Sequence, residues 1–152
     1  MTNEADFSTL GLSEQMLEAV RAKGFESPTS IQRLTIPRLL SGDNDIIAQS
    51  QTGTGKTAAF GLPILQQIEH STEGVQSIIL VPTRELAVQA AEELLSFNAG
   101  RRLSITAIYG GAAMGEQLRE VYRRMDILPA AQPAAKTNLP QAERPVQHSF
   151  TP

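Results

Sequence analysis

The sequence lacks cysteine and tryptophan, and only 5% of its 152 residues are aromatic. Without cysteine the chain can form neither a disulfide framework nor a thiolate metal site, so a metal would need oxygen ligands. It contains no apolar run of about 20 residues and no basic, apolar leader, so we expect neither a membrane span nor secretion. The cytoplasm is the default location. The formal net charge of −3 supplies no global basic field, so any contact with nucleic acid must be local.

The apolar residues that are present, 41% of the chain, suffice for the core of one domain. Short runs rich in isoleucine and valine occur at 45–48, 77–82 and 103–111, and such runs are typical of buried parallel strands. Helical patterns lie between them, and another covers 12–24, where Ser13 is the expected N-cap. This alternation predicts an α/β fold, with a parallel sheet flanked by helices.

The regular pattern ends near residue 128. A helical pattern at 114–125 leads to the start of a fourth strand at 126–128. From Pro129 onward, five of the last 24 residues are proline, which cannot donate to a sheet ladder or continue a helix. We therefore expect a partial domain at 1–128 and a tail rich in proline and alanine at 129–152, extended or disordered.

A loop suited to phosphate binding spans residues 50–57, S-Q-T-G-T-G-K-T. Gly53 and Gly55 permit backbone angles that turn amides inward, and a helix that begins near Lys56 points its free N–H groups at an anion. Lys56 would reach the β- and γ-phosphates, and the hydroxyl of Thr57 would ligate Mg²⁺. The alternative is a flexible turn, but the strand predicted before the loop and the helix predicted after it favour a phosphate site.

The chain resembles the DEAD-box RNA helicase family in four stretches that occur in the family's order. They are G-F-E-S-P-T-S-I-Q at 24–32 with Phe7 upstream (the Q motif), the loop at 50–57 (motif I), P-T-R-E-L-A at 82–87 (motif Ia) and G-G at 110–111. In this family a small residue replaces the first glycine of the loop, as Ser50 does here. The resemblance implies an incomplete RecA-like P-loop domain that binds ATP or ADP with Mg²⁺.

The nucleotide-binding residues implied by the resemblance come from the first two motifs. They are Phe7, Phe25, Gln32, Ser50, Gln51, Thr52, Gly53, Thr54, Gly55, Lys56 and Thr57, with Thr57 also the metal ligand. In the family the glutamine reads adenine, so Gln32 would bond to the base edge while Phe25 packs against its face. The residues allow another interpretation, because 29–32 also fits a capping box in which Gln32 returns to the amide of Thr29.

Weak contact with the RNA backbone is implied for Thr83, Arg84, Gly110 and Gly111. Thr83 and Arg84 stand where a predicted strand ends and a helix begins, a place where a hydroxyl, a guanidinium and free amides can converge on a phosphate. Arg84 could equally be a solvated charge, and two glycines after a strand are ordinary turn residues.

The D-E-A-D and S-A-T motifs and the family's second domain are absent from these 152 residues. The family uses those parts to anchor magnesium, orient water and stabilise the transition state, and we find no other carboxylate to replace them. We therefore assign no catalytic residue, and we expect ATP hydrolysis by this chain alone to be close to background. The alternative to the amino-terminal part of a helicase is a non-catalytic product that binds nucleotide weakly or associates with itself. Because family strands that pair beside the phosphate-loop strand are missing, we expect a homo-oligomer through exposed sheet edges or a poorly stable monomer.

Overall fold

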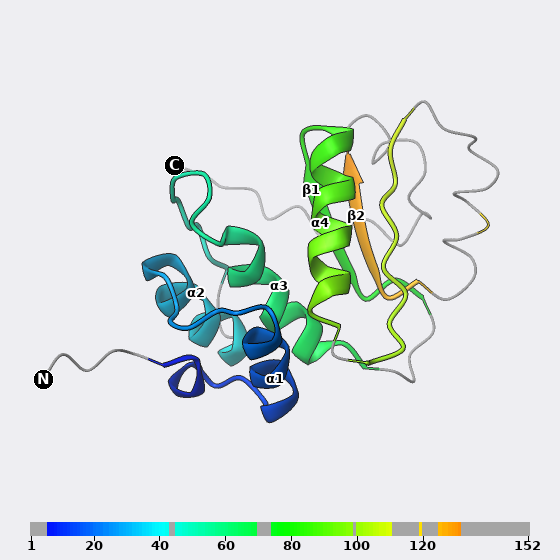
Figure 1. Cartoon of the computed structure of the whole chain (residues 1–152). Helices are drawn as coiled ribbons and strands as arrows, with labels where there is room; N and C mark the ends of the chain where they lie inside the picture. The colour runs from blue at the N-terminus through cyan, green and yellow to red at the C-terminus, as the bar shows by residue number, and fades with distance from the viewer. Residues whose placement is uncertain are drawn as a thin grey trace, which may run out of the picture.

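The computed structural model describes residues 6–42, 45–69, 74–98, 100–110, 119 and 125–131. Helices pack beside and against a small parallel sheet (Figure 1), which confirms the predicted α/β class. The elements in chain order are the 3-10 helix η1 (Phe7–Leu10), α1 (Glu14–Ala22), α2 (Ser30–Ser41), α3 (Lys56–Gln67), β1 (Ser77–Val81), α4 (Arg84–Ser96) and β2 (Ile127–Ala131). None of the helices in these described ranges is long and apolar enough to cross a bilayer.

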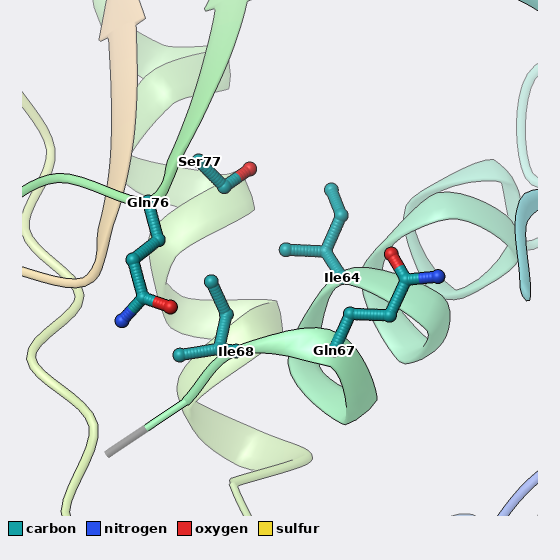
Figure 2. Close-up of a pocket in the computed structure, with 5 residues that line it drawn as sticks. All are labelled: Ile64, Gln67, Ile68, Gln76 and Ser77. Carbon is teal, nitrogen blue, oxygen red and sulfur yellow. The ribbon is translucent and has the colours of Figure 1, made fainter. Parts of the chain in front are cut away.

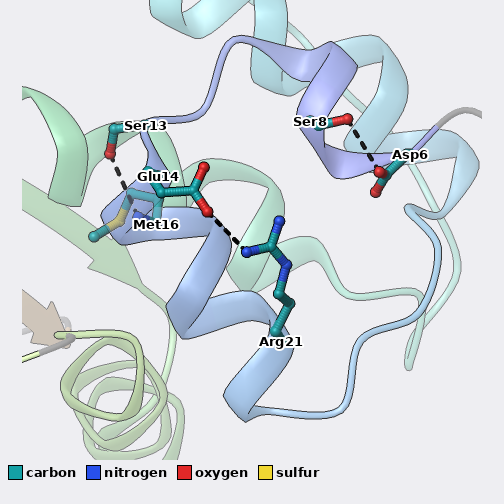
Figure 3. Close-up of polar contacts among 6 residues, drawn as sticks. All are labelled: Asp6, Ser8, Ser13, Glu14, Met16 and Arg21. Carbon is teal, nitrogen blue, oxygen red and sulfur yellow. Dashed lines mark hydrogen bonds and ion pairs between the residues drawn. The ribbon is translucent and has the colours of Figure 1, made fainter.

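Helix α1 begins at the cap that the sequence predicts. The hydroxyl oxygen of Ser13 accepts a hydrogen bond from the backbone N–H of Met16 at 3.4 Å (Figure 3), and the Met16 side chain is fully buried. On the outer face Arg21 donates to Glu14 at 2.8 Å, but both side chains are mostly exposed. The Ser13 cap and the buried apolar stripe therefore stabilise this helix, and the exposed ion pair contributes little to its stability.

The sheet is parallel, and β2 is its central segment. β1 pairs along one edge of β2 in a register that places Ser77 opposite Ile127. Along the other edge, Ile105 and Ile108 form isolated parallel bridges, and the stretch that contains them runs beside β2 in Figure 1. Helix α4 packs on both β1 and β2, and α3 packs between α2 and α4. The chain thus has a helical layer on one face of the sheet.

The predicted strand at 103–111 is only partly right, because two bridges replace a continuous strand. Pro129 of β2 supplies the physical reason. Its carbonyl accepts from the N–H of Ile108 at 2.8 Å, and Thr106 N–H bonds to Ile127 O at 3.4 Å. A regular ladder would place the next bond from residue 129 to the carbonyl of Thr106, but proline has no N–H. The pairing is therefore interrupted at its middle.

The fourth strand predicted at 126–128 is confirmed as β2, which continues to Ala131. All five of its residues are buried. The expected boundary between domain and tail at 128/129 thus falls inside a strand, and the remainder of the expected tail, 132–152, lies outside the described residues.

The predicted strand at 45–48 is wrong. Residues 45–50 have no regular secondary structure, and the side chain of Ile47 is fully exposed. An extended segment becomes a strand only when a neighbour pairs with its backbone, and no described segment pairs with this one. The segment that leads into the phosphate loop therefore pairs with no described strand.

Asp126 joins the three sheet segments at their amino ends. Its carboxylate accepts from the backbone N–H of Ser104 at 2.8 Å and from the side-chain amide of Gln76 at 3.2 Å. Its backbone carbonyl accepts from the N–H of Ser77 at 3.1 Å. One residue thus fixes the relative start of all three segments.

Arg101 holds the carboxyl end of α3. Its guanidinium donates to the carbonyl of Leu65 and, at 2.7 Å, to that of Ile68. These are carbonyls that a helix end leaves without intrahelical partners. Burial lowers the pKa of Arg101, and the nearby charge of Asp126 opposes that shift.

Candidate functional site

The phosphate loop leads directly into the first turn of α3. Gly53 and Gly55 have φ values of +76° and +77°, in the left-handed region that glycine adopts without strain. Gly55 is the N-cap of α3, and no side chain of the described residues caps this turn. The first N–H groups of α3 are thus left for another acceptor, which is the arrangement expected for an anion site.

Hydroxyl and ammonium groups of the loop bond to the loop itself. The hydroxyls of Ser50 and Thr54 are in hydrogen-bond contact, and Thr54 also donates to the carbonyl of Gln51 at 2.9 Å. The ammonium of Lys56 donates to the carbonyl of Ser50 at 2.9 Å. Ser50 therefore has a defined part in the loop that glycine could not supply, and Lys56 is held across the loop.

Residues of the loop differ in exposure. The more accessible ones are Gln51, Thr52, Gly53 and Lys56, while Ser50, Thr54, Gly55 and Thr57 are half-buried. A Cβ added at Gly53 would meet no atom within 4 Å, whereas one added at Gly55 would lie 2.4 Å from Nε2 of Gln32. The loop is open at its tip and closely packed at its base.

Gln32 forms the capping box that the sequence left as an alternative. Its side-chain oxygen accepts from the N–H of Thr29 at 2.9 Å, and the box is complete. Its side-chain nitrogen donates to the carbonyl of Gly55 at 3.2 Å, and only 2% of the residue is exposed. Gln32 therefore links the start of α2 to the base of the phosphate loop.

A second hydrogen bond reinforces this link. The hydroxyl of Thr29 donates to the carbonyl of Thr54 at 2.9 Å. Two residues of the Q-motif stretch thus contact two consecutive carbonyls of the loop. Spacing in the sequence does not reveal these contacts, because they span 25 and 23 residues.

The two aromatic residues expected at the nucleotide lie against each other. The ring centroids of Phe7 and Phe25 are 6.3 Å apart in a stacked arrangement, and Phe25 meets the buried Phe97 edge-on at 5.8 Å. Phe7 is buried in the core, whereas Phe25 is half-buried. Phe7 therefore packs against the ring of Phe25 from within the core.

Of the residues expected at RNA, Thr83 and Arg84 lie at the start of α4. The hydroxyl oxygen of Thr83 accepts from the N–H of Leu86 at 3.3 Å, so it caps α4. The guanidinium carbon of Arg84 lies 4.3 Å from the centroid of the Tyr109 ring, next to the exposed Gly110. Gly111 lies outside the described residues. Sequence reasoning missed Tyr109, although an aromatic residue just before the glycine pair was a usable signal.

The phosphate loop and the first turn of α3 offer few protein ligands for Mg²⁺. The hydroxyl of the half-buried Thr57 follows Lys56 on the first turn of α3, which suits one oxygen ligand. The described part of the chain contains no cluster of three or more acidic or histidine side chains that could hold a metal. The donor set therefore fits Mg²⁺ only where nucleotide phosphates and water complete its coordination, as is usual for this ion.

A hollow of about 190 Å³ lies at the far end of α3 from the phosphate loop (Figure 2). Its lining consists of Ile64, Gln67, Ile68, Gln76 and Ser77. None of these side chains carries a charge, so the hollow lacks a charged group that would favour phosphate or a metal ion. The candidate site is the loop at 50–57 with the residues attached to it.

Known proteins share both the sequence and the fold of this chain. Residues 29–149 match the family model for the DEAD/DEAH box helicase. The chain belongs to the DEAD/DEAH box helicase family. It is 48% identical over 122 residues to the DEAD-box ATP-dependent RNA helicase CshA of Bacillus cereus, and 48% over 130 residues to the RNA helicase CrhR of Synechocystis. These matches cover 80% and 84% of this chain but only 23% and 26% of those relatives, so it spans about a quarter of their length.

Solved structures of this helicase family agree with the fold. The crystal structure of a DEAD box protein from the hyperthermophile Methanococcus jannaschii matches with a TM-score of 0.79 at 41% identity, over 83% of this chain and 34% of that one. The crystal structure of a hypothetical ATP-dependent RNA helicase from Sulfolobus tokodaii matches with a TM-score of 0.72 at 33% identity, over 82% of this chain and 35% of that one. The predicted RecA-like fold is confirmed.

Proposed function

We propose that this chain is the amino-terminal, adenine-nucleotide-binding part of an ATP-dependent RNA helicase. The observation that carries the proposal is the pair of hydrogen bonds from Thr29 and Gln32 to the carbonyls of Thr54 and Gly55. They hold a base-recognition element and a phosphate loop in one rigid unit. Such a unit can recognise both ends of a nucleotide at once, which a loop alone cannot do.

The phosphates bind at the first turn of α3. Its uncapped N–H groups donate to phosphate oxygens, and the helix dipole favours their negative charge. Lys56 exchanges the carbonyl of Ser50 for a phosphate oxygen, a stronger partner because both groups are then charged. Thr57 holds Mg²⁺, which neutralises phosphate charge when it is bound.

Adenine binds beside Gln32 and Phe25. The Gln32 amide uses one of its two N–H donors on Gly55 and one of its oxygen lone pairs on Thr29. The remaining donor and acceptor match the acceptor and donor on the edge of adenine. Because Gln32 is almost fully buried, binding requires a small opening beside it. The half-buried ring of Phe25, supported by Phe7, offers its surface to the base.

Hydrolysis by these 152 residues alone stays close to background. They hold no D-E-A-D sequence, and the described residues offer no acidic cluster to orient water or anchor the metal. Removing the groups that position water and stabilise transition-state charge costs orders of magnitude in rate. Duplex unwinding is proposed only for a protein that also supplies those groups.

RNA binds weakly at Thr83 and Arg84 and at Gly110, the residue after Tyr109. The start of α4 provides free N–H groups, and the exposed Arg84 provides charge for a backbone phosphate. We propose the cytoplasm as the location, because both proposed ligands, ATP and RNA, are present there.

We propose, second, that the chain associates with itself, because β1 has an edge that pairs with no described strand and has exposed apolar side chains. The outer edge of β1 has no strand partner among the described residues, and the exposed fractions of Ile78 and Leu80 are 47% and 60%. An apolar edge strand without charged residues is prone to pair with another strand. Light scattering tests this proposal: a dimer supports it, and a stable monomer at all concentrations contradicts it.

The nucleotide proposal is tested by measuring ATP and GTP affinities of the wild type, Gln32→Ala and Gln67→Ala. Gln67 bonds to Leu39 O at the other end of α3 and serves as a matched control. We expect Gln32→Ala to weaken ATP binding about tenfold and GTP binding less, because one or two hydrogen bonds are lost. Equal losses would favour a capping role alone, and a folded wild type that binds neither nucleotide would refute the proposal.

A further inference from the structure

Arg84 and Tyr109 form a contact between two segments that are 25 positions apart. The guanidinium carbon lies 4.3 Å from the ring centroid, well within the range of a cation–π interaction. Arg84 begins α4 at the end of β1, and Tyr109 ends the stretch that pairs with the far edge of β2. The contact therefore spans the carboxyl end of the sheet above β2.

Arg84 has no hydrogen-bond acceptor or acidic partner within the described residues, and it is exposed. A guanidinium over a ring face still has N–H groups for other acceptors, because the ring contacts its flat surface. An arginine side chain that nothing restrains loses rotamer freedom when it binds a ligand, and this loss of entropy weakens binding. The half-buried ring of Tyr109 restricts that freedom in advance.

We propose that Tyr109 is a positioning residue for RNA: its ring holds the Arg84 guanidinium in place to bind a phosphodiester. This inference rests on the proposed RNA contact at the start of α4. The hydroxyl of Tyr109 is not needed for the effect, because the ring face makes the contact. The ring also needs no contact with RNA.

Fluorescence anisotropy with a labelled single-stranded oligouridine tests the inference on the full chain. The variants are Tyr109→Phe, which keeps the ring, Tyr109→Leu and Tyr109→Met, which remove it, and Arg84→Ala. We expect Tyr109→Phe to bind like the wild type and the two ringless variants to bind about two- to five-fold more weakly. Far-UV circular dichroism and ATP affinity identify folded variants, and Tyr109→Met replaces Tyr109→Leu if the latter does not fold.

Double variants separate positioning from direct stacking. In the Arg84→Ala background, removal of the ring should have no further effect, because no guanidinium remains to be positioned. A further loss in that background, or equal weakening by Tyr109→Phe, would overturn the inference. If the wild type binds RNA and the ringless variants bind as tightly, the inference fails while the proposed function stands. A folded wild type without RNA affinity would overturn both this inference and the proposed RNA contact.

Discussion

Substitution of the two loop glycines should have unequal costs. Both have left-handed backbone angles, with φ +76° at Gly53 and +77° at Gly55, so alanine at either position incurs strain of about 1–2 kcal/mol. A Cβ at Gly53 meets open space, whereas a Cβ at Gly55 would lie 2.4 Å from Nε2 of Gln32. Only Gly55→Ala must therefore displace the Gln32 amide.

Displacement of that amide breaks two hydrogen bonds, to Gly55 O and from Thr29 N–H. Each bond contributes about 0.5–1.5 kcal/mol, so Gly55→Ala should cost about 1–3 kcal/mol more than Gly53→Ala. Urea unfolding followed by circular dichroism measures both free energies of unfolding, provided that the slopes agree.

A Gln32→Ala background provides the control. Without the amide the clash disappears, so Gly55→Ala and Gly53→Ala should then have equal costs. Equal costs in the wild-type background would refute the reasoning, because they would show that the Gln32 amide is not held firmly against the base of the loop.

Three further substitutions test contacts elsewhere in the fold, each by urea unfolding. Gly61→Ala should destabilise by about 1 kcal/mol despite better helix propensity, because its Cβ would lie 2.6 Å from Cδ2 of the buried Leu94; a more stable variant would contradict this. Asp126→Ala should cost about 2 kcal/mol by releasing Ser104 N–H and Gln76, and a neutral effect would show that the segments align without it. Arg101→Ala should cost about 2 kcal/mol as the end of α3 loses its donors, whereas unchanged stability would show that water replaces them.

Local signals in the sequence predicted local structure well. Helix α1 follows from one cap at Ser13 and one apolar stripe, both contained in the helix itself. The loop glycines could be assigned for the same reason, since their left-handed angles depend on the turn alone. Features of this kind need no partner elsewhere in the chain.

Features that depend on distant partners could not be predicted from the sequence. The isoleucine-rich stretch at 45–48 has strand composition, but none of the segments that the structure describes pairs with it. Pro129 was a signal for the end of a strand, yet β2 continues through it because β1 pairs on the other side. The effect of the missing N–H appears instead in the pairing with Ile108.

The candidate site shows the same division. The sequence offered two roles for Gln32 and could not decide between them, since capping is local and base recognition needs a ligand. The structure shows the capping bond to Thr29. It also shows a contact with the carbonyl of Gly55, which neither of the two roles predicted. From the sequence, Arg84 could be interpreted as no more than an exposed charge at a helix start. The structure shows that its guanidinium lies over the ring of Tyr109.

The most direct test of the central claim is isothermal titration calorimetry with ADP and Mg²⁺ on the wild type, Lys56→Ala and Arg38→Ala. Arg38 is an exposed cation in the last turn of α2 and controls for loss of one positive charge. A phosphate cradle at 50–57 predicts that the wild type and Arg38→Ala bind alike and that Lys56→Ala binds about tenfold or more weakly. Equal affinity of folded Lys56→Ala and wild type would contradict the account.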